Sequence, residues 1–190
     1  MKELVFKEYS QKIGQILAER NWDDVHQLAR AMRDTWRAGG QLLLCGNGGS
    51  AGNAIHLAND YLYGVAKDKI SHGVRVEALS ANPAVITCLA NDIGYDEVFS
   101  TQILTKGGNG DLLLVLSGSG NSPNVVKALE AGKKTRMRTF AILGYTGGLC
   151  KELADVAIHF PIDDMQIAED LQLIVGHMCM QWLALDKSVS

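Results

Sequence analysis

The stretch "QLLLCGNGGSAGNAIHLANDYL", residues 41–62, consists of an apolar run, a glycine-rich segment and a segment with helical character. The apolar run at its start is typical of a short buried strand, and the segment from about residue 50 to 63 favours a helix. Residues 45–53 between them hold four glycines and two asparagines. A strand, a glycine-rich turn and a helix start together present free backbone N–H groups and the positive end of a helix dipole. Both favour the binding of an anion.

A second unit of this kind follows later in the chain. The run "DLLLVLS" (111–117) predicts a strand, and "NVVKALEAGKK" (124–134) predicts a helix. The turn between them offers hydroxyl groups and bare backbone, which can both approach a phosphate. One such loop is explained equally well as a tight turn, whereas two loops at one sheet edge favour phosphate binding. Nucleotide binding is the weaker alternative, because a Walker motif is absent and the first loop resembles a dinucleotide fingerprint only loosely.

The rest of the chain alternates between strands and helices. Strands that are apolar on both faces and alternate with helices indicate a parallel sheet covered on both sides. Residues 3–38 carry apolar side chains at helical spacing and divide into two helices at "NWDD" (21–24). We therefore expect an α/β fold over residues 1–190, a single domain built as a three-layer α/β/α sandwich with additional N-terminal helices in residues 1–38. The other predicted strands and helices cover residues 74–79, 82–92, 138–145, 156–161 and 164–186.

Composition narrows the class of protein. The chain is 47% apolar and 21% charged, with a formal net charge of -3, which argues against a general nucleic-acid binder. The basic run "KKTRMR" (133–138) is better explained as a solvated helix end. No apolar run approaches the roughly 20 residues of a membrane-spanning helix, and the N-terminus lacks the apolar core of a signal peptide, so we expect a cytoplasmic protein. The four cysteines are widely spaced without a CxxC motif, which favours buried free thiols.

Four polar side chains have spacings that suit proton transfer and metal binding. His56 and Asp60 are four residues apart on one predicted helix, so they share a face. Glu169 and His177 are eight apart on the last predicted helix and also roughly share a face. Two imidazoles and two carboxylates would form a plausible divalent-metal site, with zinc as the preferred ion. Each residue taken singly is also explained by ordinary packing or solvation.

Several motifs together resemble the sugar isomerase (SIS) domain family, in its phosphoheptose isomerase branch. These motifs are "CGNGGSAGNAIHLAND", "CLANDIGYDEVFS", "LSGSGNSPNVVKAL" and "LGYTGG", and the resemblance extends from about residue 40 to 183. The resemblance implies a flavodoxin-like parallel sheet and a homotetramer whose active sites lie at subunit interfaces. It also implies an aldose–ketose isomerase that acts on a sugar phosphate through an enediol intermediate.

The resemblance assigns roles to residues of this chain. Asp60 becomes the proton-abstracting base and His177 the second acid–base group, and His56, Asp60, Glu169 and His177 hold one divalent metal per subunit, with zinc expected. The chain departs from the branch in having Asp60 in place of Glu and Glu169 in place of Gln. An arginine that usually follows the catalytic acid is absent, and Lys67 or Lys69 would substitute for it. The predicted substrate-binding residues are Asn47, Gly48, Gly49, Ser50, Asn91, Asp92, Ser117, Gly118, Ser119, Ser122 and Glu169.

The implied reaction converts sedoheptulose 7-phosphate to D-glycero-D-manno-heptose 7-phosphate, which supplies heptose for lipopolysaccharide or another surface glycan. A non-catalytic tetramer of the same family that binds the replication initiator protein is the main alternative. A sugar-phosphate-sensing regulatory domain is a third, although such domains are usually fused to a DNA-binding module. The presence of two acids and two histidines at these spacings favours the enzyme, because a scaffold has no use for them.

Overall fold

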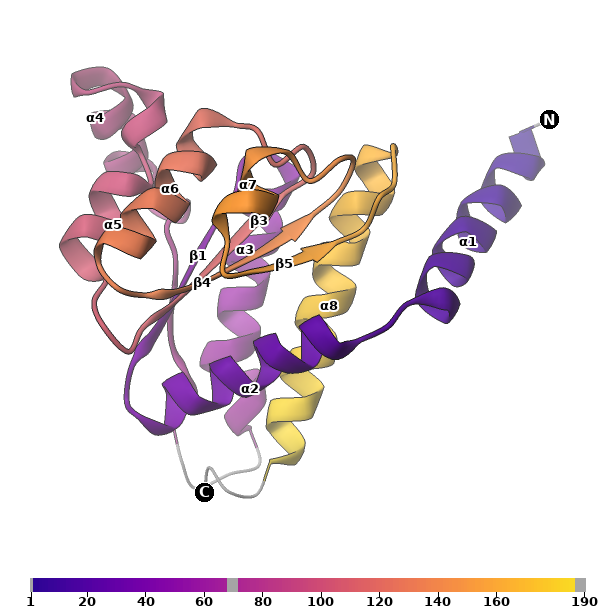
Figure 1. Cartoon of the computed structure of the whole chain (residues 1–190), viewed down its shortest axis with the longest axis horizontal. Helices are drawn as coiled ribbons and strands as arrows, with labels where there is room; N and C mark the ends of the chain where they lie inside the picture. The colour runs from indigo at the N-terminus through magenta and orange to yellow at the C-terminus, as the bar shows by residue number, and fades with distance from the viewer. Residues whose placement is uncertain (1, 68–71, 187–190) are drawn as a thin grey trace.

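A central sheet organises the chain in the computed structural model, which describes residues 2–67 and 72–186 (Figure 1). The described strands are all parallel and lie in the order β2-β1-β3-β4-β5. This is the flavodoxin-like order, in which the direction of winding reverses between β1 and β3. The strands are β1 (Gln41–Cys45), β2 (Arg75–Ala78), β3 (Leu112–Ser117), β4 (Arg138–Leu143) and β5 (Val156–His159).

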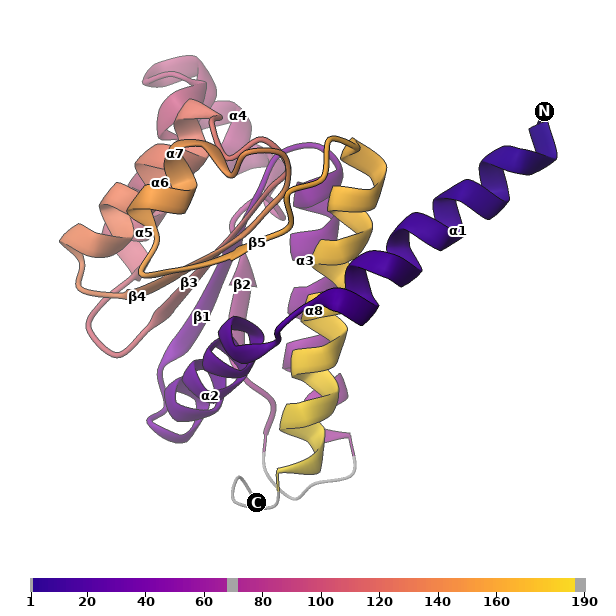
Figure 2. The same ribbon diagram turned by 45° about the vertical axis from the view of Figure 1, so that its right-hand side comes forward.

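Helices cover both faces of the sheet, which confirms the three-layer prediction (Figures 1 and 2). The first layer holds α2 (Asp23–Arg37), α3 (Gly49–Leu62) and α8 (Met165–Leu185), and the second holds α5 (Ser100–Lys106), α6 (Pro123–Lys134) and α7 (Gly148–Leu153). Alternation along the strands divides the core between these layers, because successive side chains of a strand point to opposite faces. Leu42 and Leu44 pack under the first layer, and Leu43 and Cys45 pack under the second.

The predicted elements match the observed ones within a few residues, and two short helices, α5 and α7, are additional to them. Each of these two helices has seven residues or fewer. Pro83 begins α4 (Pro83–Asp92) as predicted, and the side chain of Asn82 caps that helix. Single 3₁₀ turns, η1 (Gly64–Ala66) and η2 (Tyr95–Glu97), follow α3 and α4.

Two helices, α1 (Lys2–Glu19) and α4, are only partly packed against the core. The first projects away from the body of the molecule, and its Phe6 side chain is 77% exposed (Figures 1 and 2). The hydroxyl of Tyr9 donates a hydrogen bond of 2.5 Å to Asp170 on α8, and this bond raises the pKa of Tyr9 to about 12. Helix α4 has no fully buried residue, but Ile86 and Leu89 pack against the core from one of its faces. Exposed apolar side chains are thus found at the start of α1 and just after α4, at Ile93 and Tyr95.

The cysteines are free, as predicted, but one of them is not buried. Cys45, Cys150 and Cys179 are buried, and burial raises the pKa of the Cys150 thiol to about 11 and that of Cys179 to about 12. Cys88 is exposed, so the prediction of burial is wrong for this residue. Cys88 lies on the outward face of α4, whose other face is partly buried against the core through Ile86 and Leu89. None of the helices in residues 2–67 and 72–186 has the length and apolar content required of a membrane span.

Candidate active site

The two glycine loops meet at the carboxyl ends of β1 and β3, where the winding of the sheet reverses. Ligands of open α/β sheets bind outside this point. The first loop leads into α3 through Gly48, whose φ of 54° lies in the left-handed region that favours glycine. Neither α3 nor α6 has a side-chain hydrogen bond at its N-cap. At the start of α3 the backbone N–H groups of Gly49 and Ser50 are thus left for a ligand to engage. Helix α6 begins with Pro123, which has no N–H, so only the N–H of Asn124 is left in its first turn.

A pocket of about 240 Å³ lies between the loops. Every predicted substrate-binding residue lines it except Asn91 and Asp92. Helix α8 closes one side with Met165 and Glu169, neither of which belongs to a glycine loop. The remaining lining residues are Asn47, Gly48, Gly49, Ser50, Leu116, Ser117, Gly118, Ser119 and Ser122.

Hydrogen bonds within the protein orient the pocket hydroxyls. Ser117 Oγ accepts a bond of 3.0 Å from the N–H of Gly120, and Ser119 Oγ accepts one of 3.3 Å from the N–H of Asn121. Ser50 Oγ accepts a bond of 3.0 Å from the side-chain amide of Gln172. Each oxygen thus uses acceptor capacity inside the protein and keeps its own O–H to donate. Three hydroxyl donors around a small pocket suit the oxygens of a phosphate.

Glu169 brings a carboxylate to this pocket. A Cβ atom added to Gly49 would lie only 2.2 Å from the nearer carboxylate oxygen, so this oxygen occupies space that only a glycine leaves open. Along α8, Glu169 is eight residues from His177, a rise of about 12 Å. Within one chain Glu169 therefore lies at the loop pocket and His177 lies with Asp60, although the two residues share a helix face. The structure does not bring Glu169 to the predicted metal ligands, and its role as a ligand stays a prediction.

His56, Asp60 and His177 form a compact group farther along α3 and α8. The Nε2 atoms of the two histidines are 3.0 Å apart, and Asp60 Oδ2 lies 3.5 Å from Nε2 of His56 and 3.2 Å from Nε2 of His177. The two imidazole rings meet edge to face at 5.2 Å between centroids. Both histidine side chains are about half exposed, whereas that of Asp60 is 19% exposed. Solvent or a ligand can reach the group from the histidine side.

The three side chains fit a divalent metal. One ligand atom from each lies within 4.8 Å of the others. The observed separations are close to the roughly 3.3 Å edge of a tetrahedron with metal–ligand bonds of about 2.0–2.1 Å. Two histidines and one carboxylate also form the ligand set of catalytic zinc sites, which keep a fourth position open.

Three predicted residues lie away from both groups of side chains. Asn91 and Asp92 end α4, where Asn91 donates a hydrogen bond of 2.8 Å to Asp92 and neither residue lines the loop pocket. Lys67, which would stand in for the missing arginine, is exposed after η1. The alternative residue Lys69 lies outside the described part of the chain.

Sequence reasoning missed the contacts that hold the loops together. Asn47 in the first loop pairs with Asn124 in the first turn of α6, through two bonds of 2.8 Å. Gln172 of α8 bonds both Ser50 and Asn53 of α3, at 3.0 Å each. No spacing in the sequence signals these contacts, because their partners are between 77 and 122 residues apart.

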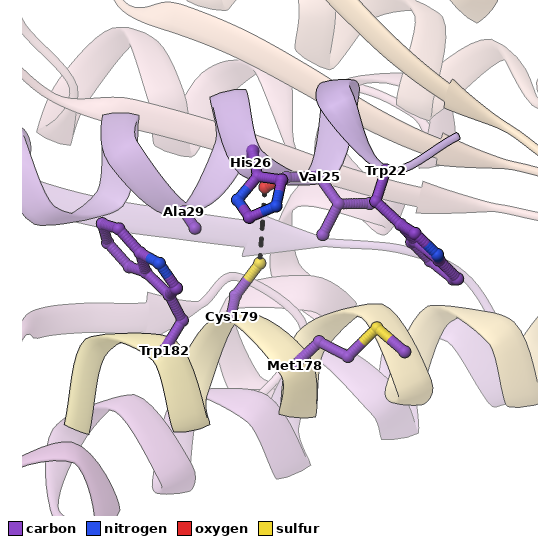
Figure 3. A pocket seen from close by; sticks show the side chains of 7 residues that line it. All are labelled: Trp22, Val25, His26, Ala29, Met178, Cys179 and Trp182. Atoms are coloured by element: carbon purple, nitrogen blue, oxygen red, sulfur yellow. Dashed lines mark hydrogen bonds between the residues drawn. The ribbon is translucent and has the colours of Figure 1, made fainter. Parts of the chain in front are cut away.

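A separate cavity of about 220 Å³ lies on the outer side of α8, between that helix and α2 (Figure 3). Its lining is mostly apolar, and Trp22 and Trp182 stand at its two ends with Met178 and His26 between them. The Cys179 thiol faces the backbone oxygen of Val25 across it, at 4.0 Å. None of the predicted site residues lines this cavity. His177 and Met178 are neighbours in the chain, but His177 faces α3 and Met178 faces α2.

A flavodoxin-like sheet with a polar pocket at its switch point, and a histidine–carboxylate group farther along the same two helices, defines the class of α/β proteins with a ligand site at this edge of the sheet. The SIS domain model matches residues 6–144, so the chain belongs to the SIS domain family. Within this family it belongs to the phosphoheptose isomerase branch. A phosphoheptose isomerase of Chlorobaculum parvum is 38% identical over 183 residues, which cover 95% of this chain and 88% of that protein.

Solved structures agree with this assignment. The phosphoheptose isomerase of Neisseria gonorrhoeae superposes with a TM-score of 0.87 at 28% identity, over 96% of this chain and 97% of that one. A phosphoheptose isomerase from Francisella tularensis gives a TM-score of 0.88 at 26% identity, over 97% of both chains. The likeness extends over nearly the whole chain.

Proposed function

We propose that the chain is an aldose–ketose isomerase that converts sedoheptulose 7-phosphate to D-glycero-D-manno-heptose 7-phosphate. The observation that carries the proposal is the contact of Asp60 with His177, on the same helix pair that borders the loop pocket. Relatives with this fold and with similar sequences are named phosphoheptose isomerases. A place in the cytoplasm, supplying heptose for lipopolysaccharide or another surface glycan, is included in the proposal.

The loop pocket holds the phosphate end of the substrate. Hydroxyls of Ser50, Ser117 and Ser119 donate to phosphate oxygens. The start of α3 adds the backbone N–H groups of Gly49 and Ser50, α6 adds that of Asn124, and both helices add a favourable dipole. From Gly49 to His56 is seven residues, a rise of about 10 Å along α3. An extended sugar phosphate anchored in the pocket therefore reaches the histidine–carboxylate group with its carbonyl end.

Asp60 and His177 carry the proton transfers. Asp60 accepts the proton from C1 of the ketose, and the C–H electron pair becomes the C1–C2 double bond of an enediol. The proton then returns to C2, and His177 moves a proton from the C1 oxygen to the C2 oxygen, which leaves an aldehyde at C1. The distance of 3.2 Å between Asp60 Oδ2 and His177 Nε2 supports this division of roles, because two groups so close together can act on adjacent atoms of one substrate. A base and an acid side by side are what an enediol mechanism needs.

His56, Asp60 and His177 would hold a zinc ion, one in each subunit. When bound, such an ion polarises a carbonyl oxygen as a Lewis acid and stabilises developing negative charge on it. His56 takes no part in the proton transfers and serves as a ligand. Asp60 combines two roles, since its carboxylate is both a ligand and the base.

The functional assembly in this proposal is a homotetramer with active sites at subunit interfaces. Support comes from the apolar side chains that one chain leaves exposed at the start of α1 and just after α4, such as Phe6 and Ile93. Asn91 and Asp92 at the end of α4 would then complete the sugar-binding site of a neighbouring subunit. This explains why they lie outside the pocket of their own chain.

The proposal is tested by turnover of the substrate. Purified protein is incubated with sedoheptulose 7-phosphate and zinc, and ¹³C NMR follows the appearance of the aldose. We expect conversion to an equilibrium mixture and loss of conversion after chelation, with recovery when zinc returns. Absence of turnover with this and with shorter ketose phosphates, metal supplied, would favour the non-catalytic scaffold that binds a replication initiator.

A further inference from the structure

Two asparagine side chains join the glycine loops directly. The amide of Asn47 donates to Oδ1 of Asn124, and the amide of Asn124 donates to Oδ1 of Asn47, both at 2.8 Å. Asn47 belongs to the first loop, after β1, and Asn124 lies in the first turn of α6, after the second loop. This pair crosses the switch point of the sheet, at the place where the phosphate would sit.

The pair is sheltered and has a third member. Asn124 is only 2% exposed, so its amide is removed from competing water. Tyr95 of η2 donates its hydroxyl to Oδ1 of Asn47, at 3.1 Å. Oδ1 of Asn47 therefore accepts two hydrogen bonds, and one N–H of that side chain remains for a ligand. Asn47 lines the pocket, whereas Asn124 does not.

We propose that Asn124 is a positioning residue for the isomerase reaction. It fixes the separation of the two loops and the orientation of Asn47, and so shapes the phosphate site without touching the substrate. The inference rests on the proposed function for its kinetic readout, although phosphate binding can be measured independently. Tyr95 contributes less to the same hydrogen-bonded group, because it supports Asn47 through one bond.

The chemistry of the pair explains why an asparagine is needed at residue 124. Only a side chain with a donor and an acceptor side by side can complete the two-bond ring with Asn47. Asn124→Ala leaves the partially buried side chain of Asn47 held only by the hydrogen bond from Tyr95. Asn124→Leu keeps the branched shape and the number of heavy atoms of the side chain, leaves no cavity, and removes the same bonds. Both variants loosen the loops, and the second guards against a cavity effect.

The test measures the steady-state kinetics of the two Asn124 variants and the affinity of the protein for inorganic phosphate by calorimetry. We expect KM to rise about tenfold with kcat changed less than about threefold, since the phosphate anchor contributes similar binding before and in the transition state. The dissociation constant of inorganic phosphate should rise by a similar factor. Tyr95→Phe should give a smaller change in the same direction.

A double-mutant cycle separates positioning from general destabilisation. In an Asn47→Ala background, Asn124→Ala should cost far less than it does in the wild type, because the pair is already broken. Thr139→Ala is the matched control: Thr139 is fully buried and bonds Asp155 at the opposite edge of the sheet. Its loss should lower the melting temperature and leave KM and phosphate affinity unchanged.

The possible failures are distinguishable. If the wild-type protein does not isomerise the ketose phosphate, the proposed function fails. The role of Asn124 is then tested only by the dissociation constant of inorganic phosphate in the two variants. If the wild type is active but both Asn124 variants keep its KM and phosphate affinity, the inference is overturned. Additive effects in the double-mutant cycle, or wild-type protein that neither turns over substrate nor binds phosphate, would also overturn it.

Discussion

At the scale of single residues, protein hydrogen bonds decide what each site group can do. Ser50 and Ser117 are buried, and each accepts a bond from the protein, so the hydroxyl proton is directed to a ligand. A free serine would rotate and lose this preference. Asp60 is the least exposed member of the histidine–carboxylate group, which suits a base that works on a substrate hydrogen.

His177 is the residue whose loss should be most damaging. We expect His177→Ala to lower kcat by about 10²–10⁴, because proton transfer between the substrate oxygens loses its mediator. Circular dichroism and the melting curve should remain close to those of the wild type, since the side chain is 42% exposed. His26→Ala is the control, because His26 lines the separate cavity between α2 and α8. Retained turnover in His177→Ala would remove this residue from the mechanism.

Glu169 should weaken the binding of phosphate, because its carboxylate shares the pocket with the anion. We expect Glu169→Gln to lower KM by roughly threefold to tenfold at low salt, with a smaller effect as the ionic strength rises. Asp163→Asn removes the same charge from an exposed position just before α8 and should leave KM unchanged. An unchanged KM together with weaker zinc affinity in Glu169→Gln would instead indicate a metal ligand completed in the assembly.

At the scale of elements, long apolar runs were enough to predict the sheet. "DLLLVLS" and "QLLLC" are apolar on both faces, and their strands are buried on both faces as expected. The segment "STQILTK" was missed because seven residues are too few to show a helical period. Its burial depends on tertiary contacts, such as the side chain of Gln102 donating to the backbone oxygens of Leu79 and Val98.

The candidate site was only partly predictable, for a related reason. Glycine loops and an i, i+4 pair are local patterns, so the loop residues and the pair of His56 and Asp60 could be found in the sequence. Asn124 and Gln172 act through partners far away in the chain, and such contacts leave no periodic trace. Helical periodicity predicts that Glu169 and His177 share a face of the helix. A shared face does not bring them together, because they are about 12 Å apart along the helix axis.

The attachment of η2 to α6 should depend on pH. Lys127 donates a bond of 2.6 Å to Glu97, and this bond, helped by the Ser100 hydroxyl, lowers the pKa of Glu97 below its ordinary value of 4.5. Between the folded and unfolded pKa values the unfolded chain binds more protons, so stability falls as the pH drops through this window. Chemical denaturation at a series of pH values should show a shallower decline for Glu97→Gln. The control Glu152→Gln, on the surface of α7, should keep the wild-type slope.

At the scale of the whole molecule, exposed apolar side chains at the start of α1 favour an assembly. Leu4 and Val5 are each 58% exposed and Phe6 is 77% exposed, on the half of the helix that projects from the body (Figure 2). Isolated helices of this length are marginal in water without packing partners. A second copy of the chain would supply such a partner.

The oligomer should therefore depend on Phe6. We expect Phe6→Glu to shift the mass measured by light scattering from that of a tetramer to that of smaller species, since a charge replaces buried apolar surface. Turnover should fall with it if subunits share active sites. Gln15→Glu adds the same charge to the exposed face on the other side of α1 and should leave the mass unchanged. A monomeric wild-type protein would contradict the proposed tetramer.

Helix α3 begins at the phosphate pocket and carries His56 and Asp60 farther along its length. Insertion of a single residue between Ser50 and His56 would turn His56 and Asp60 by about 100° around the helix axis, away from α8 and His177. A deletion would do the same in the opposite sense. In descendants of this gene, changes of length should accumulate in the loops and termini, while the stretch from Gly49 to Asp60 keeps a constant number of residues.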